Sequence, residues 1–179
     1  MICITFKDCV DIAQIITGIA AVFALIISIA SLCRSNKISK GTFLLELSDK
    51  FRDDKRRNIH DKLQENKKIM DEEEVDLDDY LGLFEVCEIM MKHNSIEQND
   101  FKKLYEYRLQ NFLCNEEEVY KKLVQEWDKW DILYELLKRC FDKHKKDFDD
   151  LKNFAKELKD KDSGIGNEQF LNIMRKLKE

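Results

Sequence analysis

The chain has 179 residues, of which 44% are hydrophobic and 37% are charged, and it contains five glycines and no proline. These turn-forming residues are too few for a β-sandwich, a β-barrel or a series of βαβ units, so the composition predicts an all-α protein. The formal net charge is -5, with acids and bases interspersed along the chain. Because no long basic face accumulates, we expect no nucleic-acid partner.

The first and strongest pattern is an uncharged run of 22 residues, 12–33. As a helix this run would be about 33 Å long, which is enough to cross the hydrocarbon core of a bilayer. The run is followed by Arg34, Lys37 and Lys40, and no acid occurs before Glu46. By the positive-inside rule, we expect residues 1–11 to be a short tail outside the inner membrane, 12–33 to be a transmembrane helix, and the remainder to be cytoplasmic.

A cleaved signal peptide is the competing interpretation of this run. Ser28-Ile29-Ala30 followed by Ser31 loosely resembles a cleavage site of small residues. However, the residues before the run are not basic, and the run is longer than the usual apolar core of about 7 to 15 residues. These two features favour an anchor that is retained.

Small and polar residues form one stripe along the predicted transmembrane helix. They recur at spacings of three and four residues and are Gln14, Thr17, Ala21, Ala24, Ser28 and Ser31. Small side chains let helix backbones approach in lipid, and hydroxyl or amide groups bond across the contact. The stripe therefore predicts a packing face for another membrane helix, with a homo-oligomer as the simplest case. The alternative is that such residues are simply frequent in membrane-spanning helices.

Apolar residues at helical spacing predict a bundle of antiparallel helices over residues 34–143, followed by a charged helical hairpin over 144–179. The helix after Gly41 is amphipathic, and Leu47 and Phe51 lie on its apolar face. This face could rest on the lipid surface or on the bundle. The segment 76–93 is apolar nearly all round, which is typical of a central helix.

Helix starts are predicted at two asparagines. Asn115 is followed by three glutamates, and Asn167 precedes the last apolar stripe. The turn before Asn167 resembles a calcium loop only superficially, because Gln169 occupies the position that needs a bidentate Glu. A stripe of large residues continues from Asn115 at helical spacing, and we interpret it as core rather than as an exposed groove for a partner peptide. It consists of Val119, Tyr120, Leu123, Trp127, Trp130, Tyr134, Leu137 and Phe141.

Arg108 lies among large apolar neighbours on the helix that is predicted after Ser95. A buried guanidinium needs a carboxylate partner, and we predict a structural pair of Arg108 with Glu85 on the preceding antiparallel helix. Glu88 on the same helix is the neighbouring candidate. The alternative is that the guanidinium reaches water past its aliphatic stem.

No catalytic, metal or cofactor pattern is present in the sequence. The histidines His60, His93 and His144 lack the spacing of a zinc helix, and none follows a Glu by three residues, as a di-iron bundle requires. Phosphate-binding glycine motifs and Gly-x-Ser-x-Gly are absent from the sequence. The six cysteines contain no Cys-x-x-Cys pair, which is typical of reduced cytosolic thiols, and Cys33 is a candidate for acylation. We therefore expect no enzyme and no cofactor.

A resemblance is carried by residues that occur in a fixed order along the chain. An apolar helix contains Tyr80-Leu81-Gly82-Leu83-Phe84-Glu85. A short turn with Ile96 follows, then a helix with Phe101, Leu104 and Tyr105, and then Asn115 and Val119 at the start of an aromatic helix. Preceded by an anchor, this order resembles a group of uncharacterised bacterial membrane-anchored helical proteins. The resemblance covers residues 10–140. It implies a membrane location and an all-helical fold, and it supplies no activity.

These patterns predict a membrane-tethered helical module that binds an unidentified cytosolic protein at the inner membrane. The alternative is a small membrane effector of the defence or toxin kind, which would act by assembly of its transmembrane helices through the stripe of small and polar residues.

Overall fold

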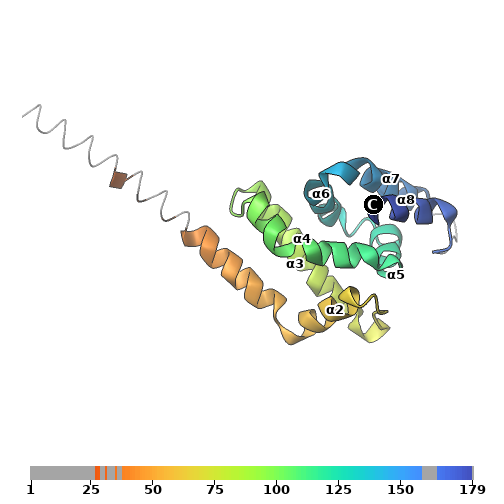
Figure 1. Ribbon diagram of the computed structural model, residues 1–179, viewed down its shortest axis with the longest axis horizontal. Helices are drawn as coiled ribbons and strands as arrows, with labels where there is room; N and C mark the ends of the chain where they lie inside the picture. The colour runs from red at the N-terminus through yellow and green to blue at the C-terminus, as the bar shows by residue number, and fades with distance from the viewer. Residues whose placement is uncertain (1–26, 29–30, 32–34, 36–37, 159–164, 179) are drawn as a thin grey trace, which may run out of the picture. The chain divides into compact units, whose positions relative to one another are not determined.

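The structure is a computed structural model, and it describes residues 27–28, 31, 35, 38–158 and 165–178 (Figure 1). Every regular element in these residues is a helix, which confirms the all-α prediction. Residues Glu46–Glu179 form one compact unit. Within the described ranges, no helix combines the length and the apolar character that a membrane span needs. The predicted transmembrane helix 12–33 lies almost wholly outside these ranges.

The first described helix covers residues 38–51 and ends in the core. Leu47 and Phe51 are each 1% exposed. The Phe51 ring lies 4.9 Å from the Phe84 ring, 5.1 Å from Tyr105 and 5.7 Å from Tyr80, measured between centroids. The sequence allows this amphipathic face to rest on the lipid surface or on the bundle. The C-terminal end of the face packs in the bundle.

The next two helices are α2 (Asp54–Gln64) and α3 (Glu74–Lys92), separated by a short 3₁₀ turn (Asp71–Glu73). α2 is thinly packed, as its charged sequence predicts, and buries Ile59, His60 and Leu63. α3 differs from the prediction of a central helix. One side of it is fully buried, but Val75, Val86 and Ile89 on the other side are 70%, 44% and 41% exposed.

α4 (Gln98–Cys114) follows α3 after a turn in which Asn94 has a positive φ of 57°. The Phe84 and Phe101 rings meet edge to face across this pair, with centroids 6.4 Å apart. The predicted start at Asn115 is confirmed, because its side-chain oxygen accepts the backbone N–H of Glu118 at 3.3 Å.

The predicted aromatic stripe does not lie on one continuous helix. It is divided among α5 (Glu116–Val119), a π-helix (Tyr120–Gln125), a turn over 126–129, and α6 (Asp131–Cys140), which Trp130 precedes. Trp130, Tyr134 and Leu137 are buried, as predicted for a core stripe. Trp127 lies in the turn and is only partly buried, with the Lys156 ammonium 5.4 Å from its ring.

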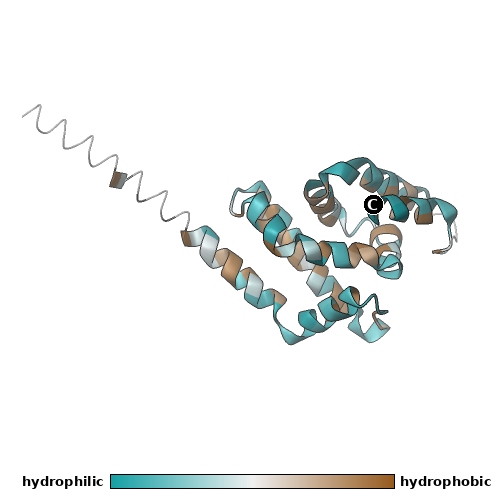
Figure 2. Ribbon diagram, viewed as in Figure 1, coloured by the Kyte–Doolittle hydropathy of each residue, from teal (hydrophilic) through white to brown (hydrophobic). Residues whose placement is uncertain are grey.

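A 3₁₀ turn (Asp142–His144) leads into the C-terminal pair, α7 (Lys145–Leu158) and α8 (Glu168–Lys178). Asn167 caps α8, because its side-chain oxygen accepts the Gln169 N–H at 2.9 Å, as predicted. The pair is docked on the rest of the compact unit: the Phe170 ring meets Tyr120 at 5.0 Å. Hydrophobic and hydrophilic residues alternate along both helices, as amphipathic packing requires (Figure 2).

Candidate functional site

The structure places only part of the predicted membrane site. Ser28 and Ser31 of the small-residue stripe are described, in helical conformation and exposed. Lys40 of the basic group is also helical and is half-buried. The remaining members lie outside the described residues: Gln14, Thr17, Ala21, Ala24, Arg34 and Lys37.

Glu85 and Glu88 on α3 contact α6 rather than Arg108, so the predicted Arg108–Glu85 pair is not what the structure shows. The Glu85 carboxylate accepts the backbone N–H of Leu133 at 3.2 Å. Glu88, which is fully buried, makes a bidentate pair with Arg139, in which both N···O distances are 2.8 Å. Charge-assisted bidentate pairs of this kind are strong, and these two contacts fasten α3 to α6.

Arg108 is held by aromatic rings instead of a carboxylate. Its guanidinium carbon lies 5.1 Å from the centroid of the Phe51 ring and 5.4 Å from that of Tyr107. Its Nε and Nη1 atoms are buried and have no hydrogen-bond acceptor among the residues that the structure describes. The charge is therefore stabilised through the faces of the rings, a contact that helical spacing alone does not predict.

A neutral histidine and a tyrosine lie beside this guanidinium. His60 Nδ1 is 3.2 Å from the Tyr80 hydroxyl. Burial, assisted by the positive charge of Arg108, lowers the pKa of His60 to about 4. Burial also raises the pKa of Tyr80. His60 and Tyr80 are therefore both uncharged near neutral pH, which leaves Arg108 as the charged member of the cluster.

A fully buried lysine, which sequence reasoning missed, lies in the π-helix. Lys122 Nζ is 2.6 Å from Asp78, 3.1 Å from Glu74 and 3.4 Å from Glu126. Burial alone would lower the pKa of Lys122, but the hydrogen bonds with Asp78 and Glu74 raise it. The ammonium ties the first half of α3 to the π-helix. The sequence does not mark this lysine as buried, because Lys121 precedes it and Glu126 follows one turn later.

The described residues offer no assembled chemistry. They contain no group of three His, Cys, Asp or Glu side chains that could hold a metal ion. Burial raises the pKa of Cys87 and of Cys140 to about 12, so both thiols are inert near neutral pH. His144 contacts Asp147 at 3.2 Å and lines a pocket of about 370 Å³ together with the exposed Cys114. No hydrogen bond joins this histidine to the thiol in the part of the chain that is described.

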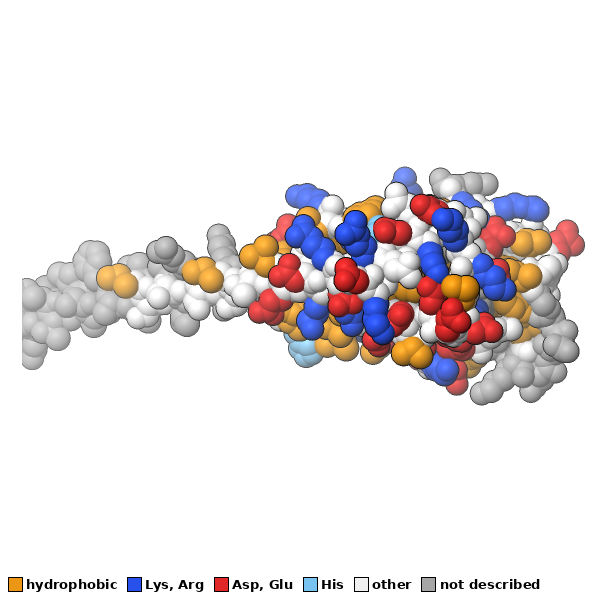
Figure 3. Space-filling model, turned by 90° about the horizontal axis from the view of Figure 1, so that it is seen from below, with side chains coloured by type: hydrophobic (Ala, Val, Ile, Leu, Met, Phe, Trp, Pro, Cys, Tyr) orange, Lys and Arg blue, Asp and Glu red, His pale blue; other side chains and the backbone are white. Residues whose placement is uncertain are grey.

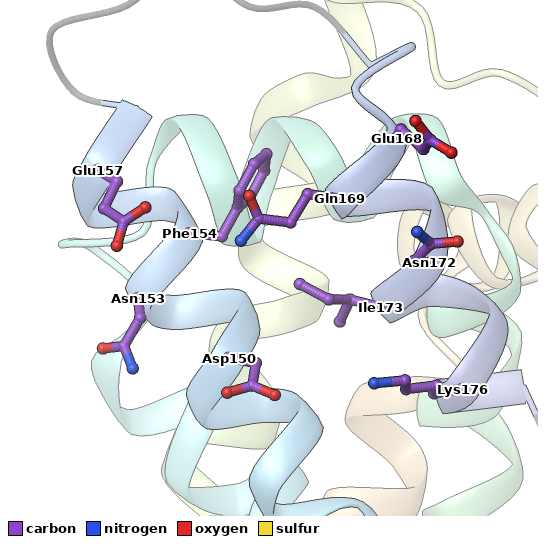
Figure 4. A pocket seen from close by; sticks show the side chains of 9 residues that line it. All are labelled: Asp150, Asn153, Phe154, Glu157, Glu168, Gln169, Asn172, Ile173 and Lys176. Carbon is purple, nitrogen blue, oxygen red and sulfur yellow. The ribbon is translucent and has the colours of Figure 1, made fainter.

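An open groove of about 760 Å³ lies between α7 and α8 (Figure 4). Phe154 and Ile173 are its buried apolar residues, and the remaining lining is polar. Figure 4 shows the polar side chains of both helices along the two sides of the groove. They are Asp150, Asn153, Glu157, Glu168, Gln169, Asn172 and Lys176. Three acids against one base suit a partner that presents a basic or amide-bearing side chain.

Acidic and basic side chains alternate over the face of the molecule in Figure 3, without a broad region of one sign. No protein-family model matches the chain, and no curated protein or solved structure was found to be similar to it. The resemblance to bacterial membrane-anchored helical proteins therefore remains a prediction from the sequence.

Proposed function

We propose that this chain is a membrane-tethered helical module that binds a cytosolic protein. One observation carries the proposal: an uncharged run at 12–33 precedes a folded, all-helical unit. A run of this length suits a single transmembrane helix. The basic group Arg34, Lys37 and Lys40 favours a cytoplasmic position for the folded unit at the inner membrane, with the N-terminus outside.

Binding rather than catalysis is supported by the contents of the folded unit. The thiols of Cys87 and Cys140 stay protonated near neutral pH, and the low pKa of His60 makes this histidine a weak base, so these groups supply no activated nucleophile or strong base. The groove between α7 and α8 offers an apolar floor with polar sides, which suits a peptide segment of a partner. A tether would raise the effective concentration of this groove for partners at the membrane surface.

Membrane topology tests the proposal directly. A reporter that is active on only one side of the bilayer is fused after Glu179, and the cells are fractionated. We expect the protein in the membrane fraction, with the reporter on the cytoplasmic side. A reporter active outside would overturn the orientation. A soluble protein that lacks its first 30 or so residues would establish the cleaved signal peptide instead.

The alternative function is a membrane effector that acts through assembly of its spans. The stripe from Gln14 to Ser31 supports it, because polar groups in an apolar span usually face protein. This function predicts growth inhibition on overexpression that is lost when Gln14 and Thr17 are replaced by leucine. Leucine at Ile15 and Ile19, off the stripe, is the matched control. A cell that grows normally at high expression would exclude the effector and leave the binding module.

A further inference from the structure

α3 carries a second packing seam on its exposed side. Counted along the helix, the seam residues fall at alternating spacings of four and three, which is the repeat of a coiled-coil contact. They are Val75, Asp79, Gly82, Val86, Ile89 and His93. The buried face of α3 lies on the opposite side, around Tyr80 and Phe84. The seam is thus additional to the contacts that build the folded unit.

The middle of the seam has the features of a helix contact that lacks its partner. Val86 and Ile89 are 44% and 41% exposed, although they lie on a regular helix that has a complete core on its other side. Between these residues and Val75 lies Gly82, and a Cβ atom built there would meet nothing within 4 Å. A mid-helix glycine makes a helix less stable than alanine does, and nothing in the described unit requires it. A second helix that approached this point closely would require it.

We propose that this seam binds a second copy of the same chain, with the two α3 helices antiparallel. The charges of the seam carry the choice of partner and direction. Asp79 lies toward its N-terminal end, and Lys92 and His93 lie at its C-terminal end. An antiparallel pair related by a two-fold axis near Phe84 places each acidic end against the basic end of the other copy. A parallel pair would place acid against acid.

The same register fits the apolar residues. A two-fold axis near Phe84 sets Gly82 of each copy opposite Val86 of the other copy. It likewise sets Asp79 of each copy opposite Ile89 of the other. The glycine then receives a β-branched side chain, which is the kind of close contact that it permits. Asp79 already approaches Arg56 at 3.8 Å, and Lys92 approaches Glu88 at 3.6 Å. These exposed contacts are weak and compatible with a further partner.

A single helix pair is smaller than the roughly 1,200–2,000 Å² that stable interfaces bury, so the dimer is weak when the protein is dilute. Confinement to a membrane raises the effective concentration of one copy for another, so the strength of the contact in cells rests on the tether proposed above. The contact itself depends only on the folded unit. The seam therefore supplies the binding module with a partner, a second copy of itself.

The test is disulfide crosslinking in membranes of the full chain, with Cys114→Ser as the background because this thiol is exposed. Two differently tagged copies are expressed together, one with Asp79→Cys and the other with Ile89→Cys. The antiparallel register predicts a disulfide between residues 79 and 89, identified in the linked peptides, and little 79–79 product. The matched control replaces Ile89→Cys by Leu104→Cys, which is similarly exposed but lies on α4.

Charge exchange supplies the second arm. With Lys92→Glu in both copies, the new glutamate faces Asp79 of the copy that keeps this acid, and we expect less of the 79–89 disulfide to form. The reciprocal substitution Asp78→Lys is not used, because Asp78 holds the buried Lys122. Glu72→Lys, a charge change outside the seam, is the control. Circular dichroism verifies that each variant remains helical. A Lys92→Glu variant that is folded and crosslinks as well as its background would overturn the charge-matched register.

The outcomes separate this inference from the proposed function. Membrane-bound, folded protein without the 79–89 disulfide would overturn the α3 dimer and leave the tether in place. A 79–79 disulfide would establish a parallel contact and overturn the antiparallel one. A soluble protein that forms the 79–89 disulfide at high concentration would remove the tether and keep the dimer.

Discussion

At the scale of single residues, the structure gives two arginines, Arg139 and Arg108, different surroundings. Arg139 forms a bidentate pair with the fully buried Glu88, so each charge compensates the other. Arg108 is surrounded by rings, and two of its donors are buried without an acceptor among the described residues. A buried charge without a counter-ion adds little stability, and an apolar residue of similar volume often does as well.

We therefore expect Arg108→Met to leave the free energy of unfolding unchanged or raise it by about 1 kcal/mol near neutral pH. The substitution also removes the positive charge that helps lower the pKa of His60, so this pKa should rise above about 4. Thermal unfolding and NMR titration of the histidine measure the two effects.

Arg139→Met is the matched control for this experiment. It leaves the buried Glu88 carboxylate without its partner and should cost about 3 kcal/mol. If Arg108→Met were equally costly, the guanidinium would contribute as much stability as one paired with a buried carboxylate, and the expectation for Arg108 would be wrong.

At the scale of elements, local chemistry could be predicted from the sequence, and contacts distant in sequence could not. Asn115 and Asn167 both cap helices as predicted, because a cap depends on a few neighbouring residues. The sequence did not predict the break between the π-helix and α6, because Trp130 and Tyr134 continue the helical spacing of the apolar residues before the break. The sequence also did not predict the partner of Glu88. Periodicity shows which face of a helix is apolar but not that α3 packs on α6, and Arg139 lies 51 residues away along the chain.

The missed π-helix leads to a prediction about Lys122. Lys122→Met keeps an unbranched side chain but removes the charge that holds Glu74 and Asp78 together. The two acids are partly exposed and recover some hydration, so we expect a loss of about 2 kcal/mol, below the 3–5 kcal/mol typical of a fully buried pair. Denaturant unfolding in detergent measures the loss.

Lys121→Met is the matched control, because Lys121 neighbours the same acid, Glu74, but is 30% exposed. Its loss should stay within about 1 kcal/mol. Equal effects of the two substitutions would show that burial of the Lys122 ammonium contributes nothing to the tie between α3 and the π-helix.

At the scale of the whole molecule, the thiols report whether the residues Glu46–Glu179 open as one unit. Cys87 on α3 and Cys140 on α6 are 0% and 2% exposed, whereas Cys114 at the end of α4 is exposed. If the unit is cooperative, the two buried thiols react only after global unfolding. Their reaction should then be at least about 1,000-fold slower than that of Cys114, as judged by peptide mass spectrometry.

The cooperativity argument links the thiols to Lys122, although the lysine touches neither of them. A loss of about 2 kcal/mol at Lys122 raises the open population about 30-fold, so Lys122→Met should speed the labelling of Cys87 and Cys140 by that factor. The rate at Cys114 should not change. Acceleration at Cys87 alone would mean that α3 opens without α6, and the bidentate pair between these helices would then not unite them into one cooperative core.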